Sequence, residues 1–323
     1  MTSRPVRTIA LLAGVSVLAG ACGISKKDST DKNLGGGSIK NTTLKGASLT
    51  VGSKDFDEQL LLGQISIVAL KAAGAKVKDK TNIQGTNNAR KALTDGDIDL
   101  YWDYTGTGWI DFLKNTTPIE DPQQQFEATM KEDLTKNKIV WADPAPANNT
   151  YALAAKQATL NKFKVKTLSD YAALAKKDPA DATLCVESEF KSRDDGFPGV
   201  EKKYGFTLPG GDEKLMDTAV VYTTLDKGKD CNFGEVFETD GRVAGLNLKL
   251  ITDDKKFFPI YNPAVTMTQA IDKKYPKIAD VFKPIAAKLD TATLSALNKK
   301  VSVDGEKPNK VAQDWLKQEG FIG

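Results

Sequence analysis

The pattern of apolar and polar positions predicts an alternation of strands and helices along the first part of the chain. The predicted elements are a strand over 48–51, a helix over 57–73, a strand over 76–84, a helix over 86–94 and a strand over 98–102. Gly74 follows the first helix as a typical helix-ending residue, and Thr86 is the predicted cap of the second. This order predicts right-handed strand–helix–strand units on a sheet covered by helices.

A second series of alternating elements begins near residue 150. It comprises strands over 151–155, 183–186, 233–238 and 246–250, helices over 169–176, 197–204 and 212–227, and a mostly helical tail over 268–318. The pattern breaks at Asp143–Pro146 and again at Thr239–Gly241. Two breaks are typical of a second α/β lobe that leaves the first and returns to it, with a ligand cleft between them. Two independent domains in tandem remain an alternative.

The first 22 residues have the pattern of an export signal. Arg4 and Arg7 precede an apolar run over 9–20, which is too short to span a bilayer. The run ends at Cys22 in a segment that resembles a bacterial lipobox, although its Leu18 lies one position earlier than usual. We therefore predict a signal peptide over 1–21, a lipid-modified Cys22 and a flexible, Gly- and Ser-rich tether over 22–46. A plain signal peptide cleaved near Ala21, or an uncut membrane anchor, are the alternatives.

Composition and charge exclude several classes of function. The 323 residues are 40% hydrophobic and 27% charged, as in a globular protein, and they include no histidine. Catalysis or metal binding that requires imidazole is therefore excluded. Without Arg4 and Arg7 there are 43 basic and 42 acidic residues, so that nothing favours nucleic-acid binding.

Motifs for cofactors and metals are weak. Residues 106–108 form a lone Gly-x-Gly, and the acidic pairs at 194–195 and 253–254 are typical of solvated loops. We expect no cofactor, no metal and no catalytic residue.

The cysteines predict one disulfide bond. If Cys22 carries lipid, Cys185 and Cys231 remain in an exported chain, where an oxidising environment favours their pairing. The bridge would close a loop of about 46 residues and contribute about 4 kcal/mol in the chain-entropy model. Two buried free thiols are the alternative.

Five segments in order resemble the substrate-binding proteins of ABC importers for osmoprotectants such as glycine betaine, carnitine and choline. The segments are 53–59 (SKDFDEQ), 99–107 (DLYWDYTGT), 149–153 (NTYAL), 238–242 (ETDGR) and 257–262 (FFPIYN). The resemblance implies a type II periplasmic-binding-protein fold, which is an α/β fold of two lobes joined by two crossovers with a ligand cleft between them. The expected lobes are 47–145 with 247–323, and 146–246.

The same resemblance implies the ligand site. A trimethylammonium group has no N–H to donate, and aromatic ring faces attract it through cation–π interactions. Tyr104, Tyr151, Phe237 and Tyr261 take the positions of the aromatic cage, while Thr107 and Gln59 take positions that hold the carboxylate or hydroxyl end of the ligand. Relatives often carry Tyr where this chain has Phe237, so a hydroxyl is missing there. Asp103 is expected at the rim of the cage.

The resemblance thus implies an extracytoplasmic receptor that is not an enzyme. It would be a monomer anchored to the bacterial membrane by lipid, and it would deliver a quaternary ammonium solute to the transmembrane subunits of an ABC permease. Three alternatives remain: the same receptor for a different small molecule, an enzyme that uses carboxylates, and an envelope lipoprotein without a transport role. If the chain is a receptor, either for a quaternary ammonium solute or for a different small molecule, the lobes are expected to close on the bound ligand.

Overall fold

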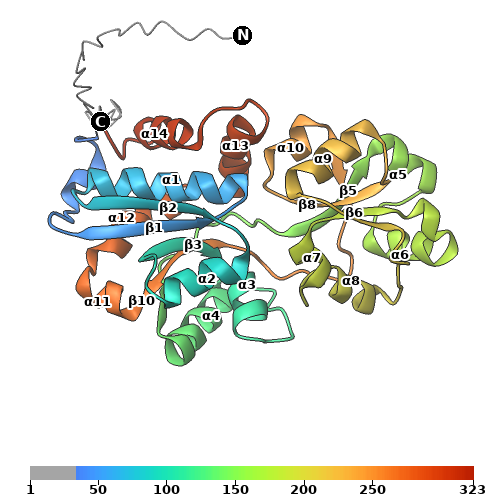
Figure 1. The fold of residues 1–323 in the computed structure, drawn as a ribbon, viewed down its shortest axis with the longest axis horizontal. Helices are drawn as coiled ribbons and strands as arrows, with labels where there is room; N and C mark the ends of the chain where they lie inside the picture. Colours follow the sequence, from blue (N-terminus) through green and yellow to red (C-terminus); the bar gives the residue numbers. More distant parts are fainter. Residues whose placement is uncertain (1–33) are drawn as a thin grey trace, which may run out of the picture. The chain divides into compact units, whose positions relative to one another are not determined.

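Two five-stranded sheets form the framework of the protein, which the computed structural model describes for residues 34–323 (Figure 1). The predicted signal peptide, Cys22 and the first part of the predicted tether lie outside the described residues. The first sheet has the order β2-β1-β3-β10-β4, and the second has the order β7-β6-β8-β5-β9. We call the parts built on these sheets the first lobe and the second lobe.

The strands are β1 (Ser48–Lys54), β2 (Lys76–Ile83), β3 (Leu100–Tyr104), β4 (Ile139–Trp141), β5 (Tyr151–Lys156), β6 (Leu184–Val186), β7 (Glu213–Leu215), β8 (Phe233–Phe237), β9 (Leu248–Leu250) and β10 (Pro263–Thr268). The α-helices of the first lobe are α1 (Asp57–Ala72), α2 (Thr86–Thr94), α3 (Thr105–Thr107), α4 (Pro122–Asn137), α11 (Gln269–Lys274), α12 (Lys277–Ala286), α13 (Thr291–Ser302) and α14 (Pro308–Gln318). Those of the second lobe are α5 (Gln157–Phe163), α6 (Leu168–Lys177), α7 (Ser188–Ser192), α8 (Phe197–Tyr204), α9 (Thr218–Lys227) and α10 (Gly241–Gly245). Within residues 34–323, three short turns of other helix types are η2 (Ser38–Asn41), η3 (Gly108–Phe112) and η4 (Pro179–Asp181).

The chain passes between the sheets twice, as the fold class predicted. The break at Asp143–Pro146 lies in the first crossing, whereas the break at Thr239–Gly241 lies between β8 and the start of α10, inside the second lobe. Residues 142–150 join β4 to β5, and residues 251–262 join β9 to β10. Each crossing delivers an antiparallel strand, because β10 runs against β3 and β4, and β5 runs against β8 and β9. The chain was predicted to return to the first lobe after residue 246. This is too early, because β9 (Leu248–Leu250) still pairs with β5 in the second sheet.

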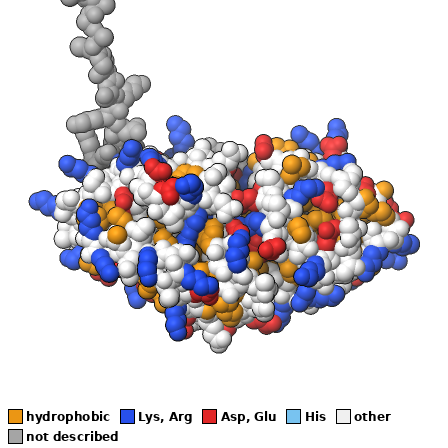
Figure 2. All heavy atoms as spheres, turned by 60° about the horizontal axis from the view of Figure 1, so that its bottom comes forward, with side chains coloured by type: hydrophobic (Ala, Val, Ile, Leu, Met, Phe, Trp, Pro, Cys, Tyr) orange, Lys and Arg blue, Asp and Glu red, His pale blue; other side chains and the backbone are white. Residues whose placement is uncertain are grey.

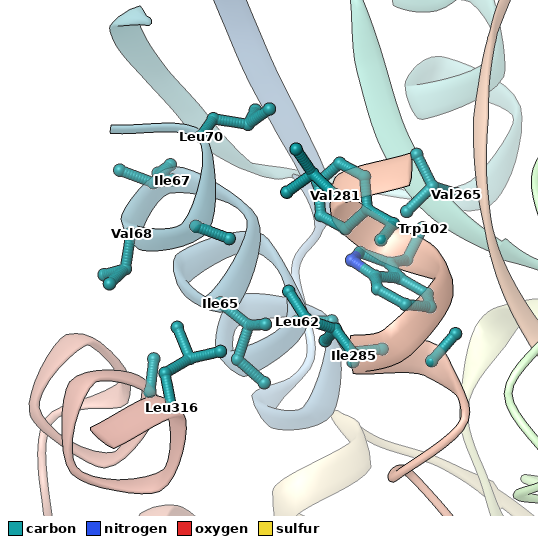
Figure 3. Close-up of a cluster of buried hydrophobic side chains, with 14 of the residues drawn as sticks. Leu62, Ile65, Ile67, Val68, Leu70, Trp102, Val265, Val281, Ile285 and Leu316 are labelled. Atoms are coloured by element: carbon teal, nitrogen blue, oxygen red, sulfur yellow. The ribbon is translucent and has the colours of Figure 1, made fainter. Parts of the chain in front are cut away.

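The core of the first lobe forms around α1, which is buried on several faces (Figure 3). Leu62 and Ile65 of α1 pack with Trp102 of β3 and with side chains of α12 and α14. Trp102 also donates a hydrogen bond from its indole nitrogen to Ser66 Oγ at 2.8 Å. Apolar residues at helical spacing on α1 therefore join the sheet to the C-terminal helices, as hydrophobic burial favours.

The second lobe contains the predicted disulfide bond. Cys185 of β6 is bonded to Cys231, which lies just before β8, with their Cα atoms 5.7 Å apart. Both half-cystines are buried in the cluster that α9 forms against the sheet. The prediction of paired thiols is therefore confirmed.

Several predicted elements differ from those observed. The helix expected over 212–227 is split into β7 and α9, because residues 213–215 pair with the edge of β6. Thr86 lies inside α2 and does not cap it; Gly85 is the N-cap, with a φ of 82° that favours glycine. The strands β4 and β10 and the helix α4 were not predicted.

The predicted tether ends earlier than residue 46. Ile39 and Leu44 are buried in the first lobe, and the backbone N–H groups of Ser38 and Ile39 donate to the carbonyls of Gly320 and Phe321. Two apolar residues and two backbone hydrogen bonds thus hold this segment on the C-terminal end of the chain.

The face in Figure 2 shows basic and acidic side chains interspersed, in keeping with the nearly balanced charge.

Candidate functional site

A cavity of about 620 Å³ lies between the two lobes, where the strand ends and the first crossing meet. The first lobe contributes residues that follow β1, β2 and β3, and the second lobe contributes residues that follow β6, β7 and β8. Such a place at the ends of parallel strands is where open α/β sheets bind ligands. Five of the six predicted ligand residues line this cavity: Tyr104, Thr107, Tyr151, Phe237 and Tyr261.

The aromatic rings reach the cavity because of the strand register. Tyr151 of β5 and Phe237 of β8 are direct partners across the second sheet, and their ring centroids lie 5.1 Å apart. Tyr261 lies at the end of the second crossing, with its ring 5.6 Å from that of Tyr151. Phe56, which was not predicted, lines the cavity too and stacks on Phe237 at 5.3 Å. Rings from both lobes and a crossing therefore face one cavity.

Hydrogen bonds fix two of the tyrosine rings. Tyr104 Oη donates to Glu58 Oε1 at 2.8 Å, and Tyr261 Oη donates to Asp195 Oδ2 at 2.7 Å. Burial raises the pKa of Tyr104 and Tyr261 well above the ordinary value, so that both hydroxyls stay protonated donors. Gly106 allows Tyr261 to approach, since a Cβ at residue 106 would lie 2.8 Å from its ring atoms.

Gln59 does not line the cavity. It is buried and donates from Nε2 to Tyr104 Oη at 3.1 Å, while its Oε1 accepts from the Lys54 N–H. Helix α1 directs this side chain behind Tyr104, so Gln59 supports the ring and does not reach the space where a ligand would lie.

Three buried cations, Lys54, Arg193 and Arg242, line the cavity and were not predicted as ligand residues. Lys54 Nζ lies 3.0 Å from Asp103 Oδ1 and 5.2 Å from the centroid of the Tyr104 ring. Arg193 forms two hydrogen bonds to Asp195, at 2.8 and 2.6 Å, and reaches Thr107 Oγ1 at 3.4 Å. Lys54 lies in the first of the five motifs, which could have indicated it, whereas no local pattern indicates Arg193.

Two expectations about acidic residues were wrong. Asp103 is fully buried in β3 beside Lys54 and is not a rim charge. Asp195 is buried too, because Arg193 and Tyr261 both bind its carboxylate. Both carboxylates are buried as partners of cations, which offsets the cost of removing them from water.

Hydrogen bonds and an ion pair also join the lobes around the cavity. Glu189 of α7 accepts from the backbone N–H of Thr86 at 2.5 Å and from its hydroxyl at 2.7 Å. Thr86 is the first residue of α2 in the other lobe, so Glu189 meets unpaired N–H groups at a helix N-terminus. Asp57 and Arg242 form a second contact between the lobes, with Oδ2 and Nη2 3.0 Å apart.

Within residues 34–323, no group of three or more Cys, Asp or Glu side chains is placed to hold a metal ion. The helices in this same range are too short or too polar to cross a membrane.

Comparisons with known proteins agree with this geometry. Residues 47–318 match the family model described as the substrate-binding domain of ABC-type glycine betaine transport systems. The glycine betaine-binding protein YehZ of Escherichia coli is 36% identical over 277 residues, which are 84% of this chain and 90% of that protein. A solved structure of apo YehZ has a TM-score of 0.63 and covers 85% of this chain and 100% of that chain, at 34% identity.

A further relative is an ergothioneine transport permease/ergothioneine binding protein, EgtU of Helicobacter pylori. It is 33% identical over 284 residues, which are 88% of this chain and 50% of that protein.

The fold and cavity therefore define a periplasmic-binding-protein type of receptor with the type II fold. The chain belongs to the family of substrate-binding domains of ABC-type glycine betaine transport systems. Its function is that of a substrate-binding receptor of an ABC importer, an extracytoplasmic protein whose partner is the ABC permease, and it is not an enzyme.

Proposed function

We propose that this receptor captures a quaternary ammonium solute, such as glycine betaine, choline or carnitine, in a cage formed by Tyr104, Tyr151, Phe237 and Tyr261. The observation that carries the proposal is that all four rings line one cavity between the lobes. Each desolvated ring contributes about 0.5–2 kcal/mol of cation–π attraction. Several rings with polar contacts can then approach the roughly −8 kcal/mol of micromolar binding.

The polar end of the ligand would lie against Thr107, Lys54 and Arg193. Both cations are desolvated and held in place by Asp103 and Asp195, so they are oriented before a carboxylate arrives. Charge-assisted hydrogen bonds to a carboxylate are shorter and stronger than neutral ones. Gln59 has an indirect role in this proposal, since it holds the hydroxyl of Tyr104.

Closure of the lobes on the ligand follows from the same arrangement. The cage draws rings from both lobes and from the second crossing, so a bound solute stabilises the state in which they are together. The contact of Glu189 with Thr86 adds to the stability of that state.

Isothermal titration calorimetry with glycine betaine, choline, carnitine and proline betaine tests the function. We expect at least one of these solutes to bind. Tyr104→Ala and Tyr261→Ala should each weaken the binding of the tightest-binding solute by about 1–2 kcal/mol, which is about tenfold, or by more. Unchanged affinity in both variants would reject the cage.

A second candidate is a receptor of the same fold for a different small molecule. Phe237 offers the ligand no hydroxyl, and one relative is an ergothioneine transport permease/ergothioneine binding protein. Ergothioneine therefore belongs in the same titration. If it binds at least tenfold more tightly than every other solute tested, ergothioneine, which is also a trimethylammonium compound, replaces glycine betaine, choline and carnitine as the ligand.

We also propose that the receptor is a monomer attached to the membrane through lipid on Cys22, after removal of a signal peptide over 1–21. The lipobox-like segment before Cys22 supports this proposal. Detergent phase partitioning should place the wild-type protein in the detergent phase and Cys22→Ser in the aqueous phase. Equal partitioning of the two would reject lipidation.

A further inference from the structure

Glu58 is a buried carboxylate on α1 that forms hydrogen bonds with four separate segments of the chain. Its Oε1 accepts from Tyr104 Oη and from Asn149 Nδ2, both at 2.8 Å. Its Oε2 accepts from Thr239 Oγ1 at 2.5 Å and from Asn298 Nδ2 at 2.6 Å. The side chain does not line the main cavity and is only 4% exposed, so a ligand in that cavity does not touch it.

The four donors come from different parts of the fold. Tyr104 ends β3 in the first lobe, Asn149 lies in the first crossing, Thr239 follows β8 in the second lobe, and Asn298 belongs to α13 in the first lobe. All four are neutral, and together they satisfy both carboxylate oxygens. Glu58 therefore links a cage ring directly to the second lobe.

The packing beside Glu58 shows that the two lobes are in close contact at this point. Gly241 begins α10, two residues after Thr239, and a Cβ at this position would lie 2.2 Å from Lys299 Cα. Lys299 follows Asn298 on α13, and Figure 1 shows α10 and α13 side by side. Asn298 Nδ2 also donates to the carbonyl of Thr239 at 2.9 Å. The Glu58–Thr239 bond thus lies at a tight junction of the lobes.

We propose that Glu58 is a positioning residue for the cage, which fixes the Tyr104 ring through its hydroxyl and couples that ring to the second lobe through Thr239. The inference rests on the proposed function, since it assigns Tyr104 to the ligand. In the closed state the ring and Thr239 share one carboxylate, so closure orients the ring. An open state that separates Thr239 from Glu58 leaves the carboxylate with one donor fewer and the ring less constrained.

Substitution of Thr239 separates positioning from folding. Thr239→Val removes the hydroxyl donor with little change in volume, and Thr239→Ser retains it. We expect Thr239→Val to weaken the tightest-binding solute by about tenfold, the scale of a hydrogen bond to a charged group, and Thr239→Ser to bind as the wild type does. Thr266→Val, a buried threonine of β10 that bonds only within the first lobe, should lose stability without losing affinity.

A double-mutant cycle tests the coupling through Glu58. Glu58→Gln places an amide against at least one donor, so affinity should fall by at least as much as in Thr239→Val. Glu58→Gln combined with Thr239→Val should lose less affinity than the sum of the two single losses, since both changes act on the same group of hydrogen bonds. Asp133→Asn is the matched control for Glu58→Gln. Asp133 is another buried carboxylate that accepts hydrogen bonds from several donors, among them Trp141 and Asn137, but it lies outside the cavity. Full affinity in Thr239→Val, or additive losses in the cycle, would overturn the inference.

A result in which the wild type binds no solute would reject the proposed function separately. The inference is then decided on the unliganded protein by small-angle scattering, where Thr239→Val should increase the radius of gyration relative to Thr239→Ser. Identical scattering of the two variants would overturn it.

Discussion

At the residue scale, the cavity wall combines aromatic rings with cations that already have anionic partners. Lys54 is paired with Asp103, Arg193 with Asp195, and Arg242 with Asp240. The partners hold each cation in place and reduce the cost of its burial, so that no side chain has to be ordered when a ligand carboxylate arrives. These pairs make it possible to separate recognition of the two ends of a solute.

Lys54→Met should distinguish ligands with and without a carboxylate. We expect glycine betaine to bind about tenfold or more weakly, since a charge-assisted hydrogen bond is lost, and choline to lose much less. Calorimetric titration of both solutes measures the difference. Arg90→Met is the control, because it breaks the buried ion pair with Asp133 away from the cavity and should reduce stability alone. Equal losses for the two solutes would show that Lys54 does not contact the carboxylate.

At the element scale, the short helix α7 of the second lobe meets the N-terminus of α2 in the first. Glu189 supplies to α2 the side-chain acceptor that its own N-cap, Gly85, lacks. A helix of one lobe is therefore completed by a residue of the other, which stabilises the closed state whether or not a ligand is bound.

Glu189→Ala should shorten the lifetime of the complex. Loss of a capping contact costs about 1 kcal/mol, so we expect the dissociation rate to rise about fivefold with little change in the association rate. Stopped-flow fluorescence measures both rates. Asp121→Ala removes the N-cap of α4, which lies within one lobe, and should lower stability without changing dissociation. A faster dissociation in both variants would mean that stability alone is responsible.

At the scale of the whole molecule, the two lobes have separate cores and different covalent reinforcement. The disulfide bond lies entirely in the second lobe, while all four tryptophans, at 102, 109, 141 and 315, lie in the first. Tryptophan fluorescence therefore reports on one lobe, and far-ultraviolet circular dichroism reports on both.

Cys185→Ser combined with Cys231→Ser should destabilise the second lobe by about 4 kcal/mol, because the unfolded loop is no longer constrained. In urea, circular dichroism should then show an early transition that tryptophan fluorescence does not follow. The wild type is the reference for both signals. Coincident transitions in the variant would show that the lobes unfold as one cooperative unit.

The amino-acid sequence by itself determined the alternation of elements, the place of the first crossing, the paired cysteines and the aromatic positions. These features depend on local periodicity, on turn residues, on composition and on motifs that can be read in order along a single chain. Tyr151 was identifiable because it lies in one of the five segments and Phe237 because it directly precedes another, although only the register of β5 and β8 makes them neighbours.

Only the tertiary structure decided which polar groups reach the ligand space. Lys54, Arg193 and Glu189 acquire their roles from partners far away along the chain, as does Glu58, whose donors include Thr239 and Asn298. Only the tertiary structure likewise shows that Gln59 lies behind Tyr104 and outside the cavity wall, and that Asp103 is buried. The physical reason is that burial and hydrogen bonding depend on long-range packing, whereas periodicity reports only on which face of its own element a residue occupies.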